Sequence, residues 1–178
     1  MAPREIVRLG HPALRAPSEP VPEERLASPE IQGLIDDMIE TLRQTGGVGL
    51  AAPQVGEGWQ IFLFERELPS EPRPIQVVVN PLVEPHGREQ VYDWEGCLSI
   101  PALLGLVPRH PAVRLWGKDR HGEAFDLELS GFTARVVQHE YDHLHGVLFL
   151  DRMRDLQSLS FAAEWDRFIA GEERAAVG

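Results

Sequence analysis

The chain has 178 residues, of which 43% are hydrophobic and 25% charged, and this is the composition of an ordinary globular domain. Its 17 basic and 28 acidic residues give a net charge of −11, which argues against direct DNA binding and against binding to an anionic membrane surface. The single cysteine, Cys97, excludes an intrachain disulfide, which fits a reducing compartment. No apolar run approaches the ~20 residues of a membrane span. We therefore expect a cytoplasmic protein with one domain over residues 1–178.

The N-terminal part of the chain predicts an arm followed by a helix. Residues 1–27 are rich in proline and predict an extended arm laid over the domain. Ser28 is a good N-cap residue, and Pro29 suits the first position of a helix. The apolar residues that follow have the spacing of a helix that faces the core: Ile31, Leu34, Ile35, Met38, Ile39 and Leu42. Gly46 and Gly47 predict the end of this helix.

The next part of the chain predicts two strands. Residues 47–54 contain too much glycine and alanine for a packed helix or a standard strand. Residues 60–65 and 76–80 are apolar and rich in β-branched or aromatic side chains, which predicts strands, and Pro81 is expected to end the second strand. A surface loop between them is indicated by Pro69, Pro72 and Pro74.

Two further strands are predicted in the second half of the chain. Residues 113–116 and 124–129 alternate between apolar and polar side chains, which is typical of strands. Residues 120–122, Arg-His-Gly, predict a hairpin turn between them. The order of helix, strands, further strands and helix lacks the alternation of a doubly wound sheet and therefore predicts an α+β fold.

The C-terminal part predicts two helices. Ser130 is expected to cap a helix over residues 131–145, which Gly146 ends. A last short helix is expected over residues 158–169, followed by a flexible tail at residues 171–178.

The helix predicted over residues 131–145 carries the pattern H-E-x-x-H at residues 139–143. Residues four apart lie on one face of a helix, so His139 and His143 can bind one metal ion, and Glu140 can reach a water on that ion. Phe132 and Val136 share the face of the two histidines, which places the pair on the buried side. The alternative is that both histidines are ordinary core residues.

A catalytic metal site of this kind needs a third protein ligand. Cys97 lies in a glycine-flanked turn over residues 95–99, where the backbone can approach a site closely. Glu164 follows the motif at a spacing compatible with a metalloprotease that uses two histidines and a glutamate. Cys97 could also be a small buried apolar residue, and Glu164 a solvated residue of the last helix, so the residues alone leave the third ligand open.

Three short motifs together resemble the peptide deformylase family. They are G-x-G-x-A-A-x-Q at residues 47–54, E-G-C-L-S at residues 95–99 and H-E-x-x-H at residues 139–143, in the order of that family. The resemblance extends over residues 8–153. It implies mixed, mainly antiparallel sheets packed around a central helix that carries the H-E-x-x-H motif.

The resemblance also implies a metal centre and its reaction. Cys97, His139 and His143 are its implied ligands for one divalent ion, Fe²⁺ in the cell, although Zn²⁺, Ni²⁺ or Co²⁺ can occupy such a site. Glu140 is the implied general base and then the acid that protonates the leaving amine. The implied substrates are newly made peptides that begin with N-formylmethionine, from which formate is released.

Further residues have implied roles toward the substrate. The side chain of Gln54 and the backbone N–H of Leu98 are implied to stabilise the oxyanion, although Gln54 could instead be a loop amide bonded to nearby backbone. Gly47 and Gly49 leave the backbone open for pairing with an extended peptide. The wall of a pocket for the methionine side chain is assigned to residues of the motif helix, Phe132 and Val136, with plain core packing as the alternative.

Two features depart from many bacterial members of the family. Leu104 stands where these carry an arginine, so a polar contact with the substrate beyond methionine is lost. Residues 151–178 have mixed charge, so docking on the ribosome by a basic C-terminal helix is not expected.

Asp142 is interpreted either as a partner of Arg109 or as an exposed helix acid.

Two other functions are compatible with the motif helix. One is an endopeptidase with Glu164 as the third metal ligand, and the other is a non-enzymatic module with a structural metal. A structural site is usually closed by a fourth protein ligand, and the chain has no second cysteine, so the structural site is the weakest of the three.

Overall fold

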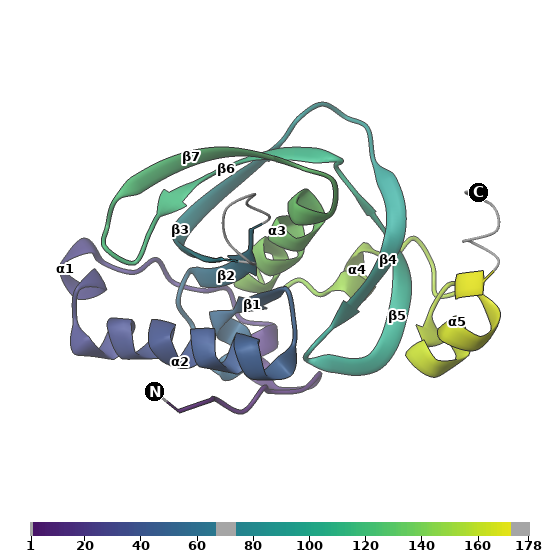
Figure 1. Cartoon of the computed structure of the whole chain (residues 1–178), viewed down its shortest axis with the longest axis horizontal. Coiled ribbons are helices and arrows are strands. Elements are labelled where there is room, and N and C mark those ends of the chain that lie inside the picture. Colours follow the sequence, from purple (N-terminus) through teal and green to yellow (C-terminus); the bar gives the residue numbers. More distant parts are fainter. Residues whose placement is uncertain (1, 67–73, 172–178) are drawn as a thin grey trace.

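The computed structural model of the chain describes residues 2–66 and 74–171. Its strands are β1 (Gly49–Ala51), β2 (Ile61–Glu65), β3 (Ile75–Pro85), β4 (Val91–Cys97), β5 (Ile100–Arg109), β6 (Ala112–Lys118), β7 (Ala124–Ser130) and β8 (Ser160–Phe161). They form one five-stranded sheet in the order β1-β2-β3-β6-β7 and one three-stranded sheet in the order β4-β5-β8, both antiparallel. The motif helix, α3 (Gly131–Leu144), lies between them at the centre of the molecule (Figure 1). The predicted α+β fold is confirmed.

The five-stranded sheet has a helix on each face. Successive side chains of a strand point to opposite faces. On β2, Ile61 and Leu63 pack in one core with α2 (Pro29–Thr45), whereas Phe62 and Phe64 pack in another core with α3. Burial on both faces explains why β2 is a continuous apolar run rather than an alternating one.

The helix predicted near the N-terminus is α2. The Ser28 hydroxyl accepts a hydrogen bond from the Ile31 N–H at 3.3 Å, and Gly46 ends the helix with a φ of 66°. The N-terminal arm contains two short helical elements that the sequence did not predict, η1 (Pro12–Leu14) and α1 (Glu23–Leu26). Residues 67–73 of the predicted proline loop and residues 172–178 of the predicted tail lie outside the described residues.

Two predictions for the five-stranded sheet were wrong. Gly49–Ala51 is a strand, because its backbone pairs with Phe62–Phe64 of β2. It is followed by the 3-10 turn η2 (Ala52–Val55). Pro81 does not end β3, because the register shifts between Val79 and Leu82 and thereby accommodates a residue that cannot donate to the ladder.

The hairpin of β4 and β5 was not predicted from the sequence. Its pairing runs from Val91 opposite Arg109 to Cys97 opposite Ile100, with a register shift after Gly96. Glycine and proline in both strands obscured the strand pattern: Gly96, Pro101, Gly105 and Pro108. The hairpin places Cys97 at the end of a strand and next to α3.

The C-terminal helices are shorter than predicted. α3 ends at Leu144, before Gly146, and the Ser130 side chain makes no capping hydrogen bond. After α4 (Phe149–Arg152), the predicted last helix is only α5 (Ala162–Phe168), because Ser160–Phe161 pairs with β5 as β8. Within residues 2–66 and 74–171, no helix is long and apolar enough to cross a membrane.

Candidate metal centre and substrate groove

α3 and the end of β4 bring three potential metal ligands together. His139 and His143 lie one turn apart on the buried side of α3, and Cys97 is the last residue of β4. Their ligand atoms all lie within 4.8 Å of one another, and Cys97 Sγ is 3.4 Å from His143 Nε2. No other cluster of three such residues occurs in the described part of the chain.

Glu164 is not part of this cluster. It is exposed on α5, which contacts β5 and lies at the far side of the β4–β5 hairpin from α3 in Figure 1. The alternative with Glu164 as third ligand is therefore wrong, because β8 ties the last helix to the edge of β5.

The donor set fits a divalent transition metal. One thiol and two imidazoles match the ligands of zinc-type sites, and three protein ligands leave a further position open, as in catalytic centres. The buried Nδ1 of His143 has no hydrogen-bond partner among the described residues, so no hydrogen bond at this nitrogen orients the ring.

A buried carboxylate, Glu95, orients His139. Glu95 Oε2 lies 2.9 Å from His139 Nδ1, and the same carboxylate accepts hydrogen bonds from Arg109 at 2.9 and 3.0 Å and from Arg135 at 2.8 Å. A proton on His139 Nδ1 satisfies this contact and leaves Nε2 for a metal. Glu95 therefore fixes both the tautomer and the ring orientation of a ligand.

The charge network continues to the surface. Arg109 Nη1 donates to Asp142 Oδ2 at 2.5 Å, and Asp142 also accepts from Arg152 at 2.6 and 3.0 Å. Arg109 and Asp142 are buried, whereas the Arg152 side chain is 50% exposed. Of the two interpretations of Asp142, the pairing with Arg109 is the one present.

Burial and neighbouring charges shift the pKa values at this site. Burial alone would raise the pKa of Glu95, but hydrogen bonds with His139 and Arg109 lower it to about 2. Burial raises the pKa of Glu140 to about 7. Burial would lower the pKa of His139, but Cys97 and Glu95 raise it well above its usual value, whereas burial and the nearby His139 lower that of His143.

Glu140 faces the cavity from the turn that carries His139. Its side chain is buried, and its Oε2 has no hydrogen-bond partner among the described residues. A Cβ atom on Gly49 would lie 2.8 Å from the Glu140 Cδ, so only glycine at this position of β1 leaves room for the carboxylate. Gly47 is less confined, because a Cβ there would meet the Leu98 Cδ1 at 3.0 Å.

Gln54 is a loop amide whose donor end faces the candidate metal ligands. Its Oε1 accepts a hydrogen bond from the Ala51 N–H at 2.8 Å, as expected of a loop amide. This contact turns Nε2 toward Cys97 Sγ at 3.5 Å and Ser99 Oγ at 3.4 Å. The amide donor of Gln54 is therefore held in one orientation beside the three candidate metal ligands, Cys97, His139 and His143.

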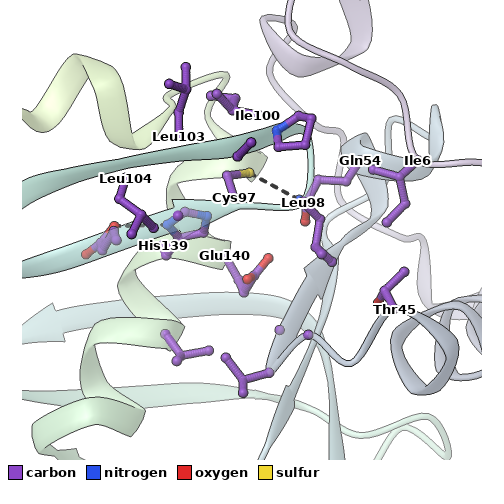
Figure 2. Close-up of a pocket in the computed structure, with 18 of the residues that line it drawn as sticks. Ile6, Thr45, Gln54, Cys97, Leu98, Ile100, Leu103, Leu104, His139 and Glu140 are labelled. Carbon is purple, nitrogen blue, oxygen red and sulfur yellow. Dashed lines mark hydrogen bonds and ion pairs between the residues drawn. The ribbon is translucent and has the colours of Figure 1, made fainter. Parts of the chain in front are cut away.

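These residues surround a cavity of about 780 Å³, shown in Figure 2. Gln54, Cys97, His139 and Glu140 lie at its inner end, and the wall includes Gly47, Gly49, Leu98, Phe132 and Val136. Val136 is 8% exposed, whereas Phe132 is 60% exposed and stands at the rim. Leu104 also lines this cavity.

Several residues of the site carried no signal in the sequence. Glu95 was noted only as part of the turn and motif over residues 95–99, without a role of its own, and the pairing of Arg135 with it was not considered. Trp94 and Ala162 line the cavity from β4 and from the start of α5, in regions without a motif. The one available signal was the position of Arg135 four residues before His139, on the face of the helix predicted to be buried, because a buried arginine requires an anionic partner.

Comparisons with known proteins agree with the three motifs. The model of the polypeptide deformylase family matches residues 3–159. Peptide deformylase 1 of Bordetella pertussis is 47% identical over 163 residues, covering 88% of this chain and 90% of its own, and peptide deformylase 2 of Pseudomonas putida is 44% identical, covering 89% and 92%. A class I type b peptide deformylase from Acinetobacter baumannii with bound Met-Ala-Ser is similar in structure, with a TM-score of 0.78, 34% identity and coverage of 85% of this chain and 99% of its own.

Proposed function

The chain belongs to the polypeptide deformylase family and is an enzyme with that activity, and we propose that Cys97, His139 and His143 hold the metal ion on which its reaction depends. The observation that carries this proposal is the convergence of the three ligand atoms within 4.8 Å beside the buried carboxylate of Glu140. One divalent ion per chain is proposed, with Fe²⁺ in the cell and Zn²⁺, Ni²⁺ or Co²⁺ as possible substitutes. When bound, such an ion supplies Lewis acidity that polarises a carbonyl group and lowers the pKa of water toward ~7.

Glu140 moves the proton in the proposed reaction. Its carboxylate accepts a proton from the attacking water, whose oxygen forms a bond to the formyl carbon. Glu140 then delivers that proton to the nitrogen of the formylated methionine as the bond between this nitrogen and the formyl carbon breaks. This step releases formate and a free amino terminus. A pKa of about 7, raised by burial, suits a group that must act first as a base and then as an acid near neutral pH.

Gln54 and Leu98 stabilise the negative charge that develops on the formyl oxygen. The contact from Ala51 N–H to Gln54 Oε1 holds the amide so that Nε2 points toward Cys97. The backbone N–H of Leu98, the residue after Cys97, is proposed as the second donor. A donor of this kind contributes ~10²–10³ in rate because it is already oriented when the charge forms.

The proposed substrates are newly made peptides that begin with N-formylmethionine. Gly47 and Gly49 offer backbone for pairing with the extended substrate, and Val136 with Phe132 forms the wall for the methionine side chain. This substrate places the enzyme in the cytoplasm. Docking on the ribosome by a basic helix is not proposed, since α5 carries both acidic and basic residues.

The test uses protein purified without oxygen and loaded with Fe²⁺. Formate release from formyl-Met-Ala-Ser and metal content are measured for wild type, Glu140→Gln and Cys97→Ala. We expect Glu140→Gln to retain the metal and to lose ~10²–10⁴ in kcat. Cys97→Ala is expected to lose the metal. Absence of formate release from metal-loaded wild type, or full metal binding by Cys97→Ala, would contradict the proposal.

A further inference from the structure

The N-terminal arm joins the two segments that carry the proposed oxyanion donors. The backbone N–H of Val7 donates a hydrogen bond to the carbonyl oxygen of Gln54 at 2.9 Å. The backbone N–H of Leu9 donates one to the carbonyl oxygen of Ser99 at 2.9 Å. Gln54 belongs to η2, whereas Ser99 follows Leu98 in the turn between β4 and β5. Three residues of the arm therefore connect two parts of the site that lie 45 residues apart in the sequence.

The arm is itself anchored on α2 before it reaches these contacts. The backbone N–H of Arg4 donates to the buried hydroxyl of Thr41 at 2.8 Å, and Arg4 Nε donates to Asp37 Oδ2 at 3.0 Å. Between this anchor and Val7, Ile6 lines the cavity (Figure 2). The two donors of the arm are therefore presented from a fixed path along the site.

The turn that carries Cys97 and Leu98 needs such support. The register of β4 and β5 shifts just before Cys97, and residues 101–103 have no partner on β4. A shift of this kind leaves part of the backbone outside the ladder. Ser99 is completely buried, so its carbonyl oxygen requires a hydrogen-bond partner, which Leu9 supplies. Leu9 thereby holds the residue that follows Leu98.

We propose, on the basis of the proposed function, that the backbone N–H groups of Val7 and Leu9 set the spacing between the two oxyanion donors, the Gln54 amide and the Leu98 N–H. Neither Val7 nor Leu9 lines the cavity, so both are positioning residues that act through the segments they hold. The two donors stabilise the transition state only when they converge on one oxygen, and a change in their spacing therefore lowers kcat.

Leu9→Pro removes one of these N–H groups while it fits the local backbone. The His11 N–H donates to the Arg8 carbonyl at 2.9 Å, and Gly10 has a φ of 104°. A positive φ at this position marks a type II turn, in which proline is common at the position that Leu9 occupies. Leu9→Ala is the matched control, because it removes the exposed side chain and keeps the N–H.

Formate release from formyl-Met-Ala-Ser and metal content are measured for both variants, loaded with Fe²⁺ in the absence of oxygen. We expect Leu9→Pro to lower kcat by about tenfold relative to Leu9→Ala, because the lost positioning acts in the transition state. KM and metal content should be equal in the two variants. Val7→Pro and Val7→Ala form a second pair, which tests the contact with Gln54 and should show the same difference.

A further comparison separates positioning from a merely structural contact. The spacing matters only while both oxyanion donors are present, so in a Gln54→Ala background the effect of Leu9→Pro relative to Leu9→Ala should shrink to less than about threefold. A contact that only supports the fold would give the same factor in both backgrounds.

Three results would overturn the inference and leave the proposed function standing. They are equal kcat for the proline and alanine variants at Val7 and Leu9, a loss of kcat that follows a loss of metal, and a tenfold loss that persists in Gln54→Ala. A metal-loaded wild type without activity on formyl-Met-Ala-Ser would instead overturn the proposed function.

Discussion

The inner end of the groove and its outer wall are built on different physical principles. At the inner end, polar and ionisable side chains are buried and held by directed contacts: Gln54 is 1% exposed, Glu95 6% and Glu140 4%. At the outer wall, apolar side chains stand partly in solvent, and Phe132 is 60% exposed. The reaction at the inner end therefore depends on the positions of polar atoms, whereas binding at the wall depends on the apolar area that the wall offers.

This difference predicts how the two regions respond to substitution. A buried polar group that loses a partner retains the cost of its desolvation, so changes at the inner end should be large. An exposed apolar side chain contributes only the area it covers, so changes at the wall should be small and should depend on the substrate. The predictions below test that contrast, beginning with the largest effect.

Gly49→Ala should lower kcat by about 100-fold, because the added Cβ displaces the Glu140 carboxylate from its place against β1. Formate release under saturating substrate measures the effect, and metal content should stay at the wild-type level. Gly47→Ala is the comparison, since its Cβ meets the mobile end of the Leu98 side chain. A loss for Gly47→Ala equal to that for Gly49→Ala would show that the approach of Gly49 to Glu140 is not what matters.

Glu95→Gln should weaken metal affinity by about 10- to 100-fold, because His139 loses the carboxylate that orients it. It should also destabilise the fold by about 3–5 kcal/mol, because Arg109 and Arg135 are buried and lose their shared anion. Metal titration and denaturant unfolding measure the two effects. Asp126→Asn, which breaks the exposed pair with Arg114 on β6 and β7, is the control and should change neither.

The stability difference between wild type and Glu95→Gln should depend on pH. The pKa of Glu95 is lowered to about 2 in the folded chain from an ordinary value of 4.5. A carboxylate with a depressed pKa contributes stability that is fully present above pH 4.5 and is lost as pH falls toward about 2. The gap in unfolding free energy should therefore shrink as pH falls below 4.5. A gap that widens in acid would contradict the ion pairs with Arg109 and Arg135.

Phe132→Ala should have the smallest effect. We expect KM for formyl-Met-Ala-Ser to rise by less than about tenfold with kcat unchanged, since a half-covered ring contributes about 1 kcal/mol of uniform binding. Phe168→Ala is the matched control, because Phe168 is 57% exposed on α5 and does not line the cavity. A fall in kcat for Phe132→Ala would mean that the rim helps to position the reacting groups.

Local features of the sequence determined the two long helices, α2 and α3, and part of the site. The cap at Ser28, the apolar spacing over residues 31–42 and the terminal Gly46 predicted α2 because each signal lies within one or two turns of the helix it controls. The spacing of His139 and His143 placed both on the buried face of α3 for the same reason. The resemblance carried by three motifs named Cys97 as their partner, although spacing alone left Glu164 as an alternative.

Only the tertiary structure decided which distant residues meet. The β4–β5 hairpin, hidden by its glycines and prolines, sets Cys97 against α3 and brings Glu95 and Arg109 around His139. Pairing of β8 with β5 turned a predicted helix start into a strand and carried Ala162 into the groove wall. Periodicity and capping act between near neighbours in the sequence, whereas these contacts join residues tens of positions apart and depend on the path of the whole chain.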